Sequence, residues 1–173
     1  MMQTGEEKMK KGVVIVGCLI GFFLNIAVAD GLVGEDTPEH DKRVRKVLDE
    51  LKYKYKIDSD GDFKLAFKTE GGRTQVAFIR SKTSKYKDLE IREIFAYAYK
   101  SDGDQLPADV ANRLLEENRV MKLGAWQKSG KFARFSAKLS ANADSDALRS
   151  VLQLVLLAAD RMEKEFTGDK DAY

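Results

Sequence analysis

The feature that most constrains the fold is a long apolar stripe near the C-terminal end of the chain. Apolar side chains recur every three or four residues from Leu148 to Phe166, which is the spacing of one buried face of an α-helix. The stripe consists of Leu148, Val151, Leu152, Val155, Ala159, Met162 and Phe166. This pattern is typical of a helix that lies on a β-sheet.

The middle of this helix holds more apolar side chains than one face can bury. Leu154, Leu156 and Leu157 lie outside the stripe, and at about 100° per residue Leu157 points almost opposite to Leu148. We therefore expect the helix to be covered on two sides. Either the first helix of the chain or a second subunit would supply the second cover, and the sequence favours neither.

Alternation of apolar and polar residues predicts the sheet. At Lys52 the apolar period changes from that of a helix to that of a strand, because lysines there alternate with Tyr53, Tyr55 and Ile57. Six strands are predicted in this way, at residues 52–57, 63–68, 75–80, 89–99, 121–128 and 131–139. The first four form an antiparallel meander, in which a polar loop at residues 81–87 precedes the longest strand.

Two further helices complete the predicted fold. Thr37 is suited to cap a helix that begins at Pro38 and ends near Leu51, and Pro107 opens another that ends near Asn118. The last helix is expected to begin after one of the residues 142–146. The sequence thus predicts an α+β domain in the order α-β-β-β-β-α-β-β-α, with the first and last helices against one face of an antiparallel sheet.

The N-terminal segment, residues 1–29, has the three parts of a cleavable secretory signal in the right order. Basic residues at positions 8, 10 and 11 precede an apolar run, Val13–Leu24, and small residues at Ala27 and Ala29 fit a signal peptidase. We expect cleavage after Ala29 and a periplasmic or secreted protein. Residues 30–37 would form a flexible leader, 38–166 the folded domain and 167–173 a frayed tail.

Two other interpretations of the N-terminal segment are less favoured. Residues 12–29 form a short apolar run for a retained membrane span, and Asn25 interrupts it. A lipoprotein site at Cys18 would follow too few apolar residues. No membrane span is therefore expected after cleavage.

Composition excludes several classes of chemistry. Cys18 is the only cysteine of the chain and lies in the signal, so the mature protein would have neither a disulfide nor a thiol nucleophile. Thirty Lys and Arg residues nearly balance 28 Asp and Glu residues, so no overall field attracts nucleic acid. The length after cleavage suits one domain.

Four stretches of the chain resemble the YbjN family. These are RVRKVLDEL at Arg43–Leu51, DGDFKLAF at Asp60–Phe67, LEIREI at Leu89–Ile94, and LLEENR at Leu114–Arg119 with LGAW at Leu123–Trp126 close behind. The resemblance covers residues 38–166 and depends on the order and spacing of these stretches. It implies a fold similar to that of type III secretion chaperones.

What the resemblance implies about function is modest. The family is described as regulators of sensory transduction and has no agreed catalytic residues to carry over. Relatives of this fold that act as chaperones bind polypeptides and commonly dimerise, which favours a binding module. A secretory signal departs from the cytoplasmic members of the family.

The polar residues predict neither a metal site nor a cofactor site. Asp58, Asp60 and Asp62 have the opening spacing of a calcium loop, but Phe63 stands where that loop requires glycine, so a hairpin turn is favoured. Gly71–Gly72 is also attributed to a hairpin. His40 is the only histidine and is expected in the first helical turn, which excludes a multi-histidine metal site.

No catalytic residues are predicted either. The serines and lysines lack the local context of a nucleophile. Glu116 and Glu117 are adjacent on a helix and point apart, so they are interpreted as solvated charges. Asn118 is expected to bond locally at the end of its helix, and Trp126 to fill the core. A hydrolase without a sequence signature stays open as a minor alternative.

One sheet face is predicted to be basic. If the strands pair as proposed, six basic side chains point away from the apolar face, namely Lys54, Lys56, Lys64, Lys68, Arg134 and Lys138. Such a face would suit an acidic partner, although ordinary solubilising lysines also explain it. The lysines and tyrosines of residues 52–56 follow from strand alternation and need no nucleic acid.

The sequence therefore favours a non-enzymatic, exported binding module without a cofactor. Its protein or peptide partner would bind the basic face or the surplus apolar surface at Leu154 and Leu157. The alternative is a self-associating envelope protein, such as a homodimer, without an obligate partner.

Overall fold

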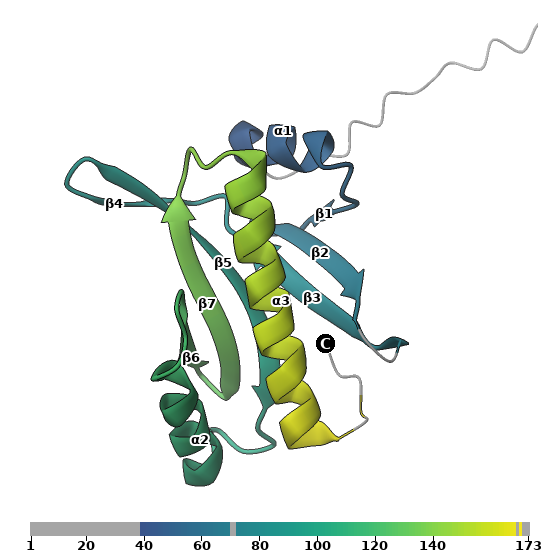
Figure 1. Cartoon of the computed structure of the whole chain (residues 1–173), viewed down its shortest axis with the longest axis vertical. Coiled ribbons are helices and arrows are strands. Elements are labelled where there is room, and N and C mark those ends of the chain that lie inside the picture. The colour runs from purple at the N-terminus through teal and green to yellow at the C-terminus, as the bar shows by residue number, and fades with distance from the viewer. Residues whose placement is uncertain (1–38, 70–71, 169, 171–173) are drawn as a thin grey trace, which may run out of the picture. The chain divides into compact units, whose positions relative to one another are not determined.

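The computed structural model describes residues 39–69, 72–168 and 170, and within them an antiparallel sheet of seven strands carries three helices (Figure 1). The α+β class predicted from the sequence is confirmed. The expected signal, the leader and the Thr37–Pro38 helix start lie outside the described residues. Most of the expected tail lies outside them as well.

The strands follow the chain with one crossover. They are β1 (Lys56–Ile57), β2 (Phe63–Lys68), β3 (Thr74–Ile79), β4 (Ser84–Tyr86), β5 (Leu89–Lys100), β6 (Ala125–Ser129) and β7 (Phe132–Ser140). Their order in the sheet is β1-β2-β3-β5-β7-β6, and β4 pairs with β5 outside this path. The twelve-residue β5 is therefore the central strand.

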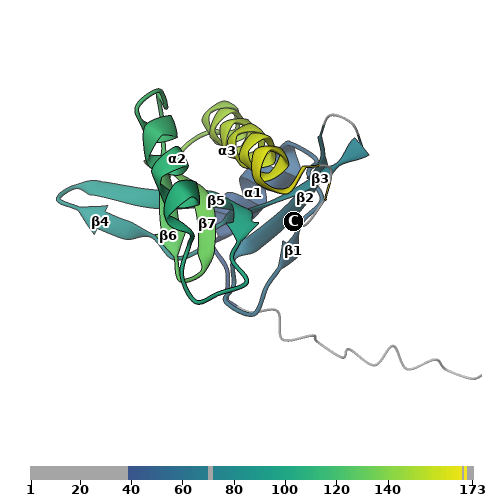
Figure 2. The same cartoon turned by 90° about the horizontal axis from the view of Figure 1, so that it is seen from below.

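The helices are α1 (Lys42–Glu50), α2 (Ala108–Asn118) and α3 (Ser145–Thr167). The long α3 crosses β3, β5 and β7, and α2 lies on the same side of the sheet (Figures 1 and 2). The first helix packs against α3 at one end. We call the opposite side of the sheet the open face, because none of the described helices covers it.

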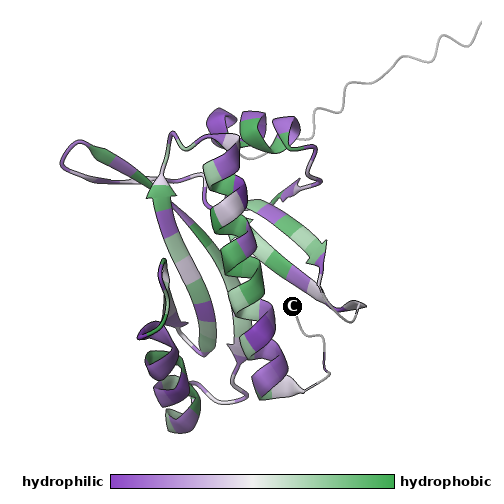
Figure 3. Ribbon diagram, in the orientation of Figure 1, coloured by the Kyte–Doolittle hydropathy of each residue, from purple (hydrophilic) through white to green (hydrophobic). Residues whose placement is uncertain are grey.

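The core lies between α3 and the sheet. Alternate strand residues such as Leu65, Ala77 and Ile94 are buried beneath the helix, as strand periodicity requires. The predicted stripe of α3 is buried from Leu148 to Met162, and Phe166 packs on Tyr99 with ring centroids 5.5 Å apart. Figure 3 shows hydrophobic residues along the middle of α3 and in the strands next to it.

A register shift divides two tyrosines of β5 between the faces. Tyr97 pairs with Arg134 of β7, but Tyr99 pairs with Ala133, so β5 has one extra residue at Ala98. Because of this β-bulge, Tyr97 points to the open face and Tyr99 points towards α3.

Four predicted boundaries were wrong. The first helix begins at Lys42, because the carboxylate of Asp41 accepts the backbone N–H of Arg43 at 2.8 Å and so caps it, and His40 precedes the helix. Residues 81–87 are not only a loop, because Ser84–Tyr86 forms β4 and returns as a hairpin into β5. The first strand is reduced to Lys56–Ile57, and the strand predicted from residue 121 begins at Ala125.

A buried ion cluster fixes α1 on the sheet. Arg92 of β5 is 1% exposed and donates to Asp41 at 2.5 Å, while Arg43 bonds both Asp41 and Glu90. Burial raises the pKa of Asp41, but hydrogen bonds from Arg43 and Arg92 outweigh this and hold the pKa well below its usual range. Hydrogen bonds from Arg43 and Thr83 lower the pKa of Glu90 to about 2.

We predict that Asp41→Asn lowers the free energy of unfolding at pH 7 by about 2–4 kcal/mol, because it leaves the buried Arg92 guanidinium without its counter-charge and weakens a helix cap. The depressed pKa makes this contribution complete above about pH 4 and lost as the pH falls towards the folded-state pKa. Urea unfolding at a series of pH values, followed by Trp126 fluorescence, measures both effects.

The control is Glu50→Gln, which removes a carboxylate of the same helix that is half-exposed and 3.9 Å from Lys46. It should change the free energy of unfolding by no more than about 0.5 kcal/mol. Equal effects of the two substitutions at every pH would contradict the role given to Asp41.

Candidate functional site

The open face is formed by side chains that share one register across four strands. Lys64 of β2 pairs with Phe78 of β3, Phe78 pairs with Phe95 of β5, and Phe95 pairs with Ser136 of β7. Directly paired residues point to the same side of a sheet, and these alternate with the residues buried beneath α3. This side therefore presents a continuous surface.

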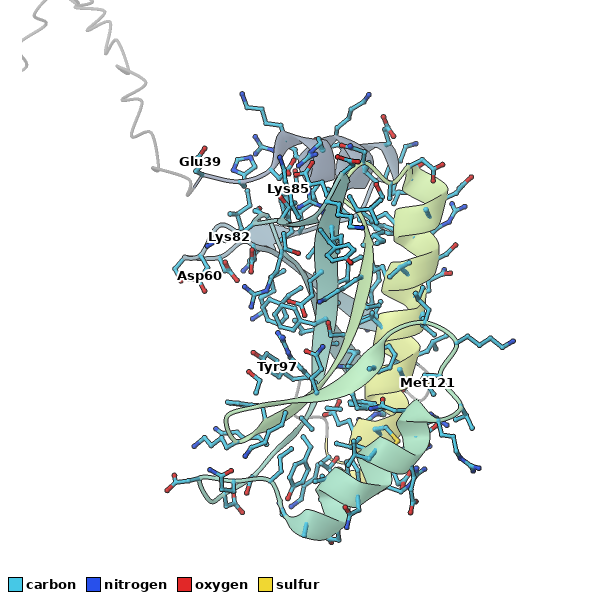
Figure 4. All side chains as sticks on the ribbon, turned by 90° about the vertical axis from the view of Figure 1, so that its left-hand side faces the viewer. Glu39, Asp60, Lys82, Lys85, Tyr97 and Met121 are labelled. Atoms are coloured by element: carbon cyan, nitrogen blue, oxygen red, sulfur yellow. The ribbon has the colours of Figure 1, made fainter. Side chains whose placement is uncertain are left out.

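Four rings form an aromatic row on the open face. They are Phe78, Phe95, Tyr97 and Phe132. Phe78 and Phe95 stack with centroids 5.1 Å apart, Phe95 and Tyr97 meet edge to face at 5.6 Å, and Tyr97 contacts Phe132 at 5.1 Å. Figure 4 shows Tyr97 on the side of the sheet away from α3. The end rings are partly exposed, whereas Phe95 is only 4% exposed.

Cationic side chains lie over the aromatic row. The guanidinium groups of Arg134 and Arg80 lie 4.7 and 5.4 Å from the centre of the Phe95 ring. At the ends of the row, the ammonium groups of Lys64 and Lys100 lie 5.8 and 5.9 Å from the rings of Phe78 and Phe132. The face of each ring attracts such cations, so the two kinds of side chain hold one another in place.

Glu93 orients the two arginines. Its carboxylate lies 3.0 Å from Arg80 Nε and 3.2 Å from Arg134 Nη2, and it accepts the hydroxyl of Ser136 at 2.6 Å. Gln127 accepts a further hydrogen bond from Arg134. Glu93 therefore offsets one of the two guanidinium charges at the centre of the face, while the lysines lie towards the edges.

Five of the six basic residues predicted for this face lie on it. They are Lys56, Lys64, Lys68, Arg134 and Lys138. Lys54 is exposed in the segment that precedes β1. The five do not form one cluster, because β3 and β5 separate those of β1 and β2 from those of β7.

The aromatic row itself was not predicted from the sequence. A signal was present, because residues 94–99 are apolar at both odd and even positions, which indicates a strand buried on both faces. Assigning Phe95 and Tyr97 to the open face also requires the pairing of β5 with its neighbouring strands and the position of the bulge at Ala98, which the structure shows.

The surplus apolar surface predicted on α3 is smaller than expected. Leu156 is 6% exposed, and Leu154 is partly buried against the core. Contacts within the chain therefore cover both residues. Leu157 is 65% exposed, and it is the part of this prediction that a second subunit would have to cover.

The calcium-like motif is a turn, as expected. Asp58 Oδ1 accepts the backbone N–H groups of Asp60 and Asp62 at 3.0 and 2.9 Å. Gly61 has φ +80°, and a Cβ there would lie 2.2 Å from the Glu39 carbonyl oxygen, so glycine is required. No group of metal-ligating side chains gathers among the described residues.

The interpretation of Glu117 as a solvated charge was wrong. This residue is 5% exposed and accepts hydrogen bonds from Arg113 of α2 and Arg161 of α3, which lower its pKa. It therefore ties the two helices together. Asn118 bonds the backbone of Trp126, which is 5% exposed and packs on Phe135, as expected of a core residue.

Neither a scan against models of known families nor a search of curated proteins found a match to this chain. Within the described residues, no helix has both the length and the apolar character that crossing a bilayer requires.

We predict that Phe95→Ala lowers the free energy of unfolding by about 3–5 kcal/mol, the cost of emptying a buried aromatic site, although the ring lies on the open face. The matched change Phe132→Ala removes a partly exposed ring and should cost less than half as much. Urea unfolding monitored through Trp126 gives both values. Equal costs would contradict the burial of Phe95 beneath two guanidinium groups.

We expect Leu157→Asp to leave both the stability and the molar mass in solution unchanged, because single exposed leucines are ordinary surface residues. The change in the free energy of unfolding should stay within about 0.5 kcal/mol. Light scattering coupled to gel filtration measures the mass. A halving of the mass would instead support the homodimer that the apolar helix suggested.

Proposed function

We propose that this chain is a non-enzymatic binding module whose open face holds a protein or peptide partner. The observation on which the proposal rests is the aromatic row, with cations over its rings and at its ends. Aromatic and arginine side chains are the residues that most often dominate the energy of protein interfaces. A sheet surface also suits a polypeptide better than a small substrate, because sites for small molecules are concave.

The distribution of charge favours an acidic protein over nucleic acid. Glu93 neutralises much of the charge of Arg80 and Arg134, and those guanidinium groups cover the ring of Phe95. A nucleic acid would need that ring for stacking and that charge for its phosphates. A centre of paired charges, with partly exposed rings and lysines towards the edges, instead suits a protein surface, because aromatic and arginine side chains are enriched in protein interfaces.

The location of the protein and its family resemblance are part of the same proposal. We propose that the module works in the periplasm or outside the cell, on the basis of the predicted signal at residues 1–29. Its resemblance to the YbjN family is in keeping with a chaperone-like or regulatory binding role. No catalytic group is needed for either role.

Site-specific photo-crosslinking tests the partner surface. A benzophenone amino acid is placed at Lys64 or Phe132 of the full chain, both on the open face, and as a matched control at the exposed Gln153 of α3. Irradiation in cells should give a discrete adduct from the open face that is at least about fivefold stronger than from Gln153, as hot-spot contacts are local. Absent adducts, or equal adducts from all three positions, would reject the proposal.

Charge substitutions then test the chemistry of the partner. With the crosslinker at Phe132, Lys64→Glu with Lys68→Glu should reduce the adduct with an acidic partner, whereas Glu93→Gln should increase it by releasing two guanidinium charges. The opposite response would show that the partner is basic and would overturn this part of the proposal.

A further inference from the structure

The hairpin of β4 and β5 extends beyond the body of the sheet (Figures 1 and 2). Its last paired residues are Tyr86 and Leu89, joined by a turn in which Lys87 has φ +52°. No strand other than β5 pairs with β4 among the described residues. The end of the hairpin is thus held by few contacts with the body of the domain.

Two large apolar side chains stand together at this end. Tyr86 is 64% exposed and Leu89 is 63% exposed, and their direct pairing places both on the same side of the hairpin. Exposed apolar residues scattered singly are normal, but a cross-strand pair at the end of an arm is a small contiguous patch. We call Tyr86 and Leu89 the hairpin tip.

Positive charge surrounds the hairpin tip. Lys87 Nζ lies 5.8 Å from the centre of the Tyr86 ring. Lys85 and Lys87 also line a groove of about 680 Å³ that extends from the hairpin turn to the end of β7, where Lys138 and Asn142 form part of its other wall. Lys82 and Lys85 lie at the same end of the molecule (Figure 4).

The nearest carboxylates offset part of this charge. Glu90 lines the same groove and pairs directly with Lys85, while both of its oxygens also accept hydrogen bonds from Arg43 at 2.8 Å. Asp88 is the other acidic residue of this groove, which Lys85, Lys87 and Lys138 also line. The groove is therefore suited to anions.

We propose that the hairpin tip docks the protein on the surface of an anionic lipid bilayer. Tyr86 and Leu89 enter the interfacial region of the bilayer, where aromatic rings that carry a polar group are enriched. Lys85, Lys87 and Lys138 face the lipid phosphates, and each basic residue close to such a surface strengthens binding several-fold. This contact lies at the hairpin end and shares only Lys138 with the open face proposed to hold the partner.

Sedimentation with lipid vesicles tests the docking. The mature chain, without the predicted signal at residues 1–29, is mixed with vesicles of phosphatidylcholine alone or with equal phosphatidylglycerol, and the bound fraction should be at least about tenfold higher on the anionic vesicles and fall as salt is added. Tyr86→Ser with Leu89→Ser should weaken binding by about tenfold or more. The triple change of Lys85, Lys87 and Lys138 to Gln should remove most of the salt dependence.

The matched control replaces two leucines of equal exposure away from the hairpin. Leu115→Ser with Leu157→Ser removes side chains that are each 65% exposed and should leave vesicle binding unchanged. Equal losses in the control and in the tip variant would show non-specific adsorption and would overturn the proposal. Loss of binding with a halved molar mass in the tip variant would show a contact between two copies and would overturn it too.

A fluorescence-quenching measurement shows whether the hairpin tip, and not another part of the chain, enters the bilayer. Trp126 is the only tryptophan and is 5% exposed, so lipids brominated on their acyl chains should leave its fluorescence unchanged. Tyr86→Trp should add a signal that these lipids quench. Vesicle binding without quenching at position 86 would assign the contact to another segment and reject the proposal.

Discussion

The packing of α3 across the central strands is the contact on which the remaining features depend. Its buried residues meet alanines of the sheet that are fully buried, Ala77, Ala96 and Ala137, and side chains of this size let a helix approach closely. Because α2 and α3 occupy the same side, the other side of the sheet is covered by its own side chains. The aromatic row and its cations are thus a consequence of one-sided helix packing.

Arginine–carboxylate contacts hold the helices to the sheet at several points. Asp41 meets Arg92 at the end near α1, and Arg73 of the β2–β3 hairpin lies 3.1 Å from Asp160 of α3. Removing one partner of such a buried pair is far more costly than the pair is favourable, so these contacts fix geometry more than they add stability. They fix the start of α1 on β5 and the β2–β3 hairpin on α3.

Local periodicity was enough to predict the fold class, the stripe of α3 and most of the strands. The hairpin turn at Asp58–Asp62 was also predicted, because its hydrogen bonds join near neighbours. The buried ion pairs were not, because Asp41 and Arg92 are 51 residues apart and a single sequence gives no measure of such proximity. The basic face was predicted from alternation, but the rings between its cations required the strand order, in which β7 lies beside β5.

The bulge at Ala98 has a consequence for how this chain can change over evolutionary time. One extra residue sends Tyr97 and Tyr99 to opposite sides, so loss of Ala98 would restore regular alternation and leave both rings on their present sides. Loss of a β5 residue before the bulge would instead turn the later side chains over, so that the ring that closes the end of α3 would lie outside and Lys100 would be driven into the core. Insertions and deletions should therefore collect in the hairpin turns and at the bulge, while the rest of this strand keeps its length.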